Sequence, residues 1–275
     1  MTPFRASSGS TETWRNFDFA VEEGVATLTL SRPDRLNALT FDSYADLRDL
    51  LAELPHRGDA RVLVITGAGR GFCSGGDVEE IIGELQLMKP AQLLEFTRMT
   101  GAVVKALREC PLPVIAAVNG VAAGAGAVIA LASDFRLLAR SASFAFLFTR
   151  VGLAGADMGA AYLLPRVVGL GRATELLVLG DKLSSERADR IGLATQVVAD
   201  EELPAAARAL ARRLADGPAL AYSTTKVLLT RELDMDLGSA IEMEATTQAL
   251  LMKSDDHREF YAAWSESRKP MWRGQ

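Results

Sequence analysis

The sequence predicts an α/β fold built around a parallel β-sheet. Four short apolar segments, at about residues 25–30, 62–66, 114–118 and 135–139, have the composition of buried strands. Helical segments lie between most of them, and such alternation is typical of parallel strand pairing. From Met158 onward the pattern is almost entirely helical. These observations favour an α/β core followed by a helical C-terminal region.

The N-terminal elements follow from local composition. Residues 2–12 are rich in Ser and Thr, so we expect residues 1–13 to form a mobile tail. The segments 17–21 and 25–30 have strand composition, and Glu-Glu-Gly at 22–24 is typical of a hairpin turn between them. The chain is therefore expected to start with an antiparallel hairpin.

Apolar periodicity predicts the helices. Apolar side chains recur at helical spacing from Tyr44 to Leu54, and Pro55 is expected to end that helix. A second amphipathic helix is predicted at 90–109. The C-terminal region has a short strand at 194–198, and its helices are predicted at 201–215, 220–229, 237–252 and 256–265.

A glycine-rich segment at 67–77 carries five glycines in eleven residues and leads into a helix that begins at Val78. No Gly-Lys-Ser/Thr follows it, and the glycine spacing of a Rossmann fold is absent, so a nucleotide-phosphate loop is not expected. Asp77 is predicted to cap the helix. The amide of Gly76, at the start of this helix, is a better candidate for a functional group than the Asp77 side chain.

The chain is organised around residues 113–134. A strand at 114–118 passes through the turn Asn119-Gly120 into residues that are mostly Gly and Ala, and then into a helix that ends near Asp134. Such residues let another group approach the backbone, and the first N–H groups of a helix have no partner within it. A carbonyl oxygen that gains negative charge would be stabilised there. Taken alone, the composition favours a simpler explanation, tight helix packing in a core.

Composition argues against several classes of function. The 275 residues are 49% hydrophobic and 24% charged, as in an ordinary globular protein. A net charge of −5 argues against a nucleic-acid-binding surface. Cys73 and Cys110 are too few for a disulfide framework, and His56 and His257 lie in surface-like contexts without metal-ligand spacing. With no apolar run long enough to span a bilayer, we expect a cytoplasmic protein without a metal or membrane partner.

Four stretches together resemble the crotonase (enoyl-CoA hydratase/isomerase) superfamily. They are R-P-D-R-L-N-A-L at 32–39, G-F-C-S-G-G-D at 71–77, the stretch 113–134, and L-P-R-V-V-G at 164–169 followed by G-R-A-T-E at 171–175. The resemblance continues through S-R-K-P-M-W-R-G at 267–274 and covers nearly everything after residue 16.

The resemblance implies a spiral of ββα units with a helical trimerisation region at the C-terminus. Residues 14–199 would form the acyl-CoA-binding core, and residues 200–275 the helical region of a homotrimer or homohexamer. The ligand would be an acyl-CoA thioester, with no cofactor beyond its CoA moiety. In the family two backbone amides form an oxyanion hole for the thioester carbonyl, and the matching positions are Gly76 and Ala125. Residues matching the CoA-binding segments are Arg35, Asn37, Ala38, Leu39, Gly75 and Asp77.

The sequence departs from the hydratase pattern where the catalytic carboxylates are expected. Hydratases of the family carry one Glu in the central helix and a second about twenty residues later. The matching positions are Val128 and either Phe148 or Thr149, and none of them is acidic. Syn addition of water uses a base and an acid, so losing both carboxylates should impair the usual mechanism.

One acid remains in the same region. Asp157 matches the aspartate of ring-1,2-epoxyphenylacetyl-CoA isomerases, of dienoyl-CoA isomerases and of 4-chlorobenzoyl-CoA dehalogenase. In each, the carboxylate points toward the acyl chain, so the resemblance implies a catalytic role for Asp157. From the residues alone, a helix N-cap before Met158 is the more ordinary interpretation. Arg150 is a candidate partner that would weaken the basicity of Asp157.

Proton transfer is the favoured chemistry. With the thioester polarised, one carboxylate can remove the C2 proton and return it at C4, which moves a double bond from the 3- to the 2-position. An apolar pocket that excludes water suits isomerisation better than hydration. The residues expected to line the pocket are Phe72, Val128, Phe146, Phe148 and Met158.

Other functions stay open from the sequence. A hydratase would use Asp157 with a differently placed water, and a dehalogenase would clamp a benzoyl ring between aromatic side chains. A non-catalytic acyl-CoA binder would keep the fold after losing both glutamates. RNA binding is known in a relative of the family, but the acidic composition argues against it.

Overall fold

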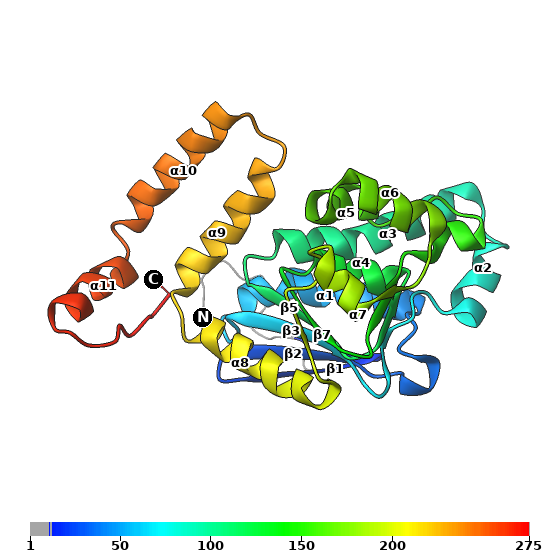
Figure 1. Ribbon diagram of the computed structural model, residues 1–275, viewed down its shortest axis with the longest axis horizontal. Coiled ribbons are helices and arrows are strands. Elements are labelled where there is room, and N and C mark those ends of the chain that lie inside the picture. The colour runs from blue at the N-terminus through cyan, green and yellow to red at the C-terminus, as the bar shows by residue number, and fades with distance from the viewer. Residues whose placement is uncertain (1–10, 12, 275) are drawn as a thin grey trace.

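The computed structural model describes residues 11 and 13–274, and it confirms the predicted α/β architecture (Figure 1). Most of the predicted tail lies outside the described residues. The strands are β1 (Phe17–Glu22), β2 (Val25–Leu30), β3 (Val62–Gly67), β4 (Gly71–Cys73), β5 (Val114–Val118), β6 (Val121–Ala123), β7 (Phe135–Ala139), β8 (Ser143–Ala145), β9 (Leu183–Ser184) and β10 (Gln196–Val198). The helices are α1 (Phe41–Arg57), α2 (Gly83–Leu85), α3 (Pro90–Glu109), α4 (Ala125–Ala132), α5 (Ala160–Val168), α6 (Leu170–Leu179), α7 (Ser185–Arg190), α8 (Leu203–Ala215), α9 (Ala219–Glu232), α10 (Leu237–Leu251) and α11 (Asp255–Ser265).

The larger sheet has six strands in the order β1-β2-β3-β5-β7-β10. Strands β2, β3, β5, β7 and β10 pair in parallel, as the alternation of strands and helices predicts. The predicted hairpin is confirmed, because β1 and β2 pair antiparallel around Glu23 and Gly24, which both have positive φ. All five residues of β5 are buried, so the sheet forms the centre of the core.

A second sheet lies beside the first, in the order β4-β6-β8-β9. Strands β4, β6 and β8 are parallel neighbours, and each follows a strand of the larger sheet in the chain. The chain therefore repeats a strand-strand-helix unit three times. This is the spiral of ββα units that the sequence resemblance implies.

Helix α4 lies in the middle of the molecule, and all eight of its residues are buried. A methyl group added to Gly126 would lie 2.2 Å from the carbonyl oxygen of Cys73, so α4 packs directly on the backbone of the first glycine-rich segment. The small residues of this stretch therefore do serve tight packing. The same packing holds the start of α4 against the loop that follows β4.

Helix α1 covers one side of the core with an apolar face that includes Tyr44 and Leu54. Thr40 caps its N-terminus by accepting a hydrogen bond from the Ser43 amide at 3.1 Å. The prediction that Pro55 ends this helix was wrong, because the helix continues to Arg57. A proline in the last turn removes only one backbone hydrogen bond, and Gly58 in a left-handed conformation ends the helix instead.

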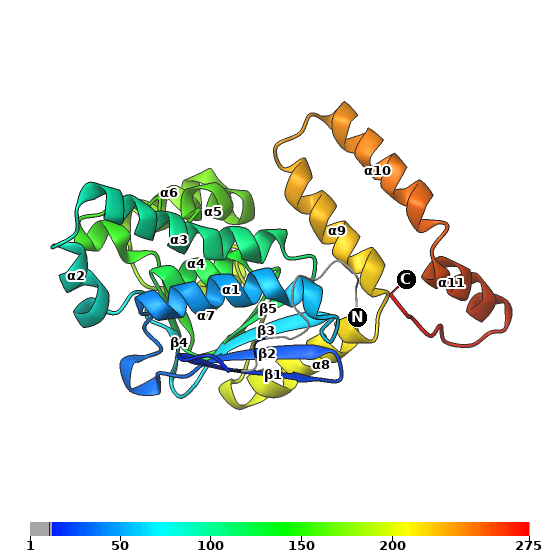
Figure 2. The same cartoon turned by 180° about the vertical axis from the view of Figure 1, so that it is seen from behind.

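Helices α9, α10 and α11 form a C-terminal arm that extends away from the core (Figures 1 and 2). Helix α8 packs on the larger sheet, and α9 leads out to α10 and α11. Lys226 anchors α9, since its buried ammonium group donates to the carbonyl oxygens of Leu107 at 3.0 Å and Leu112 at 2.9 Å. It also pairs with Asp134 at 2.8 Å. The base of the arm is therefore fixed to the end of α3.

Removing this anchor should destabilise the protein. We expect Lys226→Ala to lower the free energy of unfolding by about 3 kcal/mol, because two buried carbonyl oxygens and a carboxylate lose a charged donor. Urea denaturation measures the effect. The control is Lys105→Ala, which removes an exposed ion pair with Glu109 at 3.8 Å and should cost less than about 1 kcal/mol. Equal losses of the free energy of unfolding in the two variants would contradict the role of Lys226 as the anchor of α9.

Candidate active site

The second sheet places three segments that carry candidate site residues at one edge. Parallel strands end on the same side, so the segments after β4, β6 and β8 emerge together. They contain, in chain order, Gly76, Ala125 and the stretch that leads to Asp157. A hydrogen bond from the Gly124 amide to the Ala145 carbonyl oxygen, at 2.9 Å, ties the second segment to the third. The three predicted catalytic positions thus belong to adjoining segments.

Each candidate oxyanion donor directly follows a glycine with positive φ. Gly75 has a φ of 100°, and Gly124 has a φ of 50° with a ψ of −122°, which residues with a side chain rarely adopt. The two loops touch, since a methyl group added to Gly75 would lie 3.6 Å from the Ala125 nitrogen. Within the described part of the chain, the N–H groups of Gly76 and Ala125 have no hydrogen-bond acceptor. Both amides are free to bind an oxygen atom of a ligand.

The segment at 32–39, which matches the CoA-binding stretch, is joined to the first glycine-rich loop. The Leu39 amide donates to the Gly75 carbonyl oxygen at 2.8 Å, and the Leu39 carbonyl oxygen accepts from the Asp77 amide at 2.8 Å. The side chain of Asn37 is buried and donates to the carbonyl oxygens of Ala68 and Gly71. Asn37 is therefore a structural link, and its side chain has no N–H group left for a ligand.

Asp77 caps the helical turn that follows it, as predicted. Its carboxylate accepts hydrogen bonds from the amides of Glu79 at 3.0 Å and Glu80 at 3.1 Å, and it pairs with Arg32 at 3.1 Å. Burial alone would raise the pKa of Asp77, but these hydrogen bonds and Arg32 outweigh it and the pKa is lowered. Arg35, the candidate for a phosphate contact, is exposed and pairs with Glu79 at 2.8 Å.

Asp157 lies in the loop that connects the third segment to α5. Its Oδ1 accepts from the Met158 amide at 2.8 Å, and no described residue donates to Oδ2. Burial raises its pKa, an effect that the Met158 N–H partly offsets. Asp157 opens the turn that begins at Met158, since its carbonyl oxygen accepts from the Ala160 amide at 2.8 Å, but Gly159 rather than Asp157 is the N-cap of α5. The carboxylate is half-buried and keeps a free oxygen, as a base requires.

Arg150 does not neutralise Asp157. Its guanidinium group pairs instead with Asp181, at 3.0 Å, in an exposed position. Among the residues that the structure describes, no charged side chain contributes to the pKa shift of Asp157. The sequence suggestion of an Arg150–Asp157 pair was therefore wrong, and the basicity of Asp157 depends on burial rather than on a neighbouring cation.

The residues expected to form the apolar pocket are buried. Phe72 and Val128 are inaccessible, and Phe146 stacks on Phe144 with ring centroids 6.5 Å apart. Phe148 and Met158 retain slight exposure. Met158 also adopts a φ of 50°, a strained conformation for a residue with a side chain, immediately after the candidate base.

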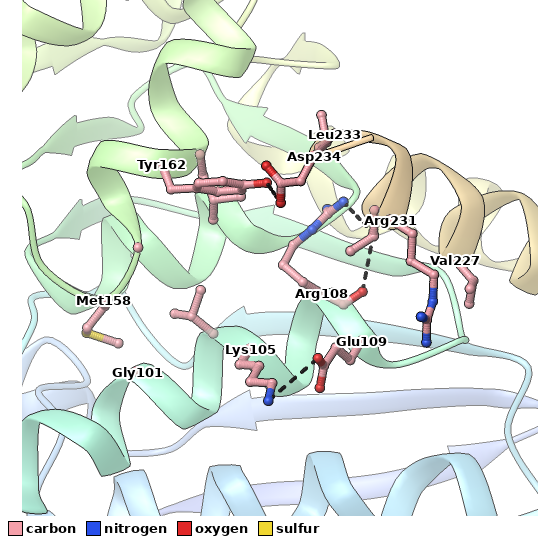
Figure 3. A pocket seen from close by; sticks show the side chains of 14 residues that line it. Gly101, Lys105, Arg108, Glu109, Met158, Tyr162, Val227, Arg231, Leu233 and Asp234 are labelled. Atoms are coloured by element: carbon pink, nitrogen blue, oxygen red, sulfur yellow. Dashed lines mark hydrogen bonds and ion pairs between the residues drawn. The ribbon is translucent and has the colours of Figure 1, made fainter. Parts of the chain in front are cut away.

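A cavity of about 870 Å³ lies between α3, α5 and α9 (Figure 3). Met158 and Gly159 form part of its wall, but the glycine-rich loops do not. Tyr162 and Asp234 also line the cavity, and the Tyr162 hydroxyl donates to Asp234 at 2.7 Å. This hydrogen bond links α5 to the turn after α9. The cavity thus borders the candidate site only through the residues after Asp157.

Other chemistries find little support. Burial raises the pKa of Cys73 to about 12, so its thiol is not an activated nucleophile. The described residues contain no cluster of potential metal ligands, and His56 and His257 are exposed. None of the described helices is both long and apolar enough to cross a membrane.

Sequence reasoning missed one polar group in this region. Tyr44 was counted only as an apolar position of α1, but its hydroxyl lies near Gly76. The available signal was a phenol on the buried face of an amphipathic helix, where an O–H group normally needs a partner.

Comparison with known proteins agrees with this architecture. The family model described as enoyl-CoA hydratase/isomerase matches residues 20–275. The chain is 40% identical over 255 residues to 1,2-epoxyphenylacetyl-CoA isomerase of Escherichia coli, covering 93% of this chain and 97% of the relative. It is 39% identical over 259 residues to a probable enoyl-CoA hydratase of Rhodobacter capsulatus, covering 94% and 97%. A crystal structure from Streptomyces coelicolor A3(2) shares 62% identity over the full length of both chains, with a TM-score of 0.98. The chain belongs to the enoyl-CoA hydratase/isomerase family.

Proposed function

We propose that the protein is an acyl-CoA isomerase that moves a double bond from the 3- to the 2-position of an enoyl-CoA. The observation that carries the proposal is a half-buried carboxylate, Asp157, on a segment that adjoins two amides without a hydrogen-bond acceptor among the described residues. The amides of Gly76 and Ala125 would bind the thioester oxygen and stabilise the charge that develops when a C2 proton leaves. Asp157 would take this proton and return it at C4.

The surroundings of Asp157 support isomerisation over hydration. The positions of the two hydratase glutamates hold Val128 and Phe148 or Thr149, so no second carboxylate is available there to activate water. Isomerisation needs only one group that first accepts and then donates a proton. The E. coli relative is itself named as an isomerase.

Hydration is the second candidate, since the R. capsulatus relative carries a hydratase name. The two reactions separate in one experiment, in which purified protein is assayed with 2-enoyl-CoA and 3-enoyl-CoA in parallel. The proposal expects conversion of the 3-enoyl-CoA without rapid addition of water to the 2-enoyl-CoA. Fast hydration without a double-bond shift would discard isomerisation, and binding without turnover would indicate a non-catalytic binder.

The pH dependence follows from the state of Asp157. The base works only when deprotonated, and burial raises its pKa above the ordinary 3.8. Activity should therefore be present above this raised pKa and be lost as the pH falls through it. A profile of kcat/KM against pH measures the midpoint, with circular dichroism to confirm that the fold persists. A midpoint at or below 3.8 would contradict the role of a buried base.

We also propose that the C-terminal arm packs against other copies of the chain in a homotrimer or a dimer of trimers. Helix α10 has no buried residue in the single chain. Its apolar side chains Leu237, Ile241 and Leu250 are each more than half exposed. An apolar helix of this length gains most of its stability from packing. Light scattering should give three or six times 29.5 kDa, and a monomer would contradict the proposal.

A further inference from the structure

Gly101 lies in the middle of α3, where a glycine weakens a helix relative to alanine. Packing does not explain it, because a methyl group built on Gly101 would meet no described atom within 4 Å beyond its own helical turn. Gly126 of α4 differs, since its methyl group would lie 2.2 Å from a carbonyl oxygen. Gly101 lines the cavity of about 870 Å³ between α3, α5 and α9. The missing side chain therefore leaves space in this cavity.

One face of α3 borders the cavity. Gly101, Val104 and Arg108 line it, as expected for residues three and four apart on a helix. The apolar part of this face adjoins the start of α5, because a methyl group built on Gly159 would lie 3.7 Å from a methyl carbon of Val104. Leu163 of α5 also lines the cavity, and both Val104 and Leu163 are buried. The wall on this side is therefore apolar.

This apolar side of the cavity adjoins the candidate base. Met158 directly follows Asp157 in the chain and forms part of the cavity wall. Figure 3 shows Met158 and Gly101 at one end of the cavity and the exposed Arg231 at the other. An acyl group whose C2 to C4 atoms lie at Asp157 is thus one residue away from space in which its chain can continue.

We propose that Gly101 sets the length of the acyl group that the protein accepts, by keeping the cavity open for the part of the chain beyond C4. The inference rests on the proposed acyl-CoA function and names its substrate class, which is 3-enoyl-CoA esters whose chain continues for several carbons past the double bond. Each methylene group buried against the apolar wall should strengthen binding about fourfold. Because these contacts are the same in the ground state and the transition state, they should lower KM and leave kcat unchanged.

The test compares 3-hexenoyl-CoA with 3-dodecenoyl-CoA as substrates in steady-state kinetics. The wild-type protein should have a kcat/KM at least about tenfold higher for the longer ester, through a lower KM. Gly101→Phe fills the cavity and should remove this preference, while kcat/KM for the shorter ester changes less than about twofold. Gly101→Leu should remove part of the preference, and it carries the test if the phenylalanine variant does not fold.

The matched control is Gly171→Phe. Gly171 lies at the start of α6 and outside the cavity wall, and a methyl group built on it would also meet no described atom within 4 Å. This variant should keep the wild-type preference for the longer ester. All three variants should melt no lower than the wild-type protein, because both Leu and Phe favour a helix more than Gly does.

Three results would overturn the role of Gly101 while the acyl-CoA function stands. They are a wild-type protein without a preference for the longer ester, a folded Gly101→Phe that keeps the preference, and equal losses with both esters. A folded Gly101→Phe that keeps the preference but changes its mass in light scattering would assign the cavity to a second copy of the chain. Failure of the wild-type protein to bind either ester would overturn the acyl-CoA function as well.

Discussion

Replacement of Asp157 by Asn should lower the turnover of a 3-enoyl-CoA by at least about a hundredfold. The substitution removes the proton acceptor but keeps an oxygen that can accept the hydrogen bond from the Met158 amide. Affinity for the CoA ester should stay similar, since the amides of Gly76 and Ala125 are untouched. Steady-state kinetics and calorimetry measure the two quantities separately.

The melting temperature of Asp157→Asn shows whether a loss of turnover comes from the missing base or from unfolding. Folding raises the pKa of Asp157, so the charged carboxylate opposes folding at neutral pH. Asp157→Asn should therefore melt at the same temperature as the wild-type protein or higher. Asp181→Asn, which removes the exposed partner of Arg150, should leave turnover unchanged. Full activity in Asp157→Asn would eliminate the proposed base.

Gly124→Ala should lower kcat by about a hundredfold to a thousandfold, the usual cost of losing one oxyanion donor. Gly124 has a φ of 50° and a ψ of −122° just before the Ala125 amide. A side chain strains this conformation, and relief of the strain would turn the N–H group away from its present direction. The effect should appear in kcat more than in KM, because the charge on the oxygen is greatest in the transition state.

The matched control for this variant is Gly171→Ala. Gly171 lies within α6, has no positive φ, and an added methyl group would meet no atom within 4 Å. Activity should be unchanged, and stability should rise by up to about 1 kcal/mol because Ala favours helices. If Gly124→Ala retained wild-type kcat with an intact fold, the Ala125 amide would not be an oxyanion donor.

The large elements of the fold could be predicted from the sequence because they carry strong periodicity. The strand at 114–118 and the helix at 90–109 have the predicted bounds. The second sheet could not be predicted, because β4, β6 and β8 have three residues each and show no repeat. In β6 the sequence Val-Ala-Ala merges with the small residues around it.

The same limit applies to the candidate site. Similarity to the family predicted that Gly76, Ala125 and Asp157 belong to one site. Their position at the same edge of the second sheet depends on the pairing of β4, β6 and β8, which the sequence did not predict. Partners of side chains that lie far apart in the sequence were harder to predict. Arg150 pairs with Asp181 across the loop before α7, and periodicity placed Tyr44 in the core without indicating where its hydroxyl points.

A crystal structure of the protein with a bound, unreactive acyl-CoA tests the central claim most directly. The thioester oxygen should lie about 2.7–3.1 Å from both the Gly76 and the Ala125 nitrogen, with a carboxylate oxygen of Asp157 in contact with C2 or C4. A thioester held away from either amide, or an Asp157 side chain turned from the acyl carbons, would contradict the account.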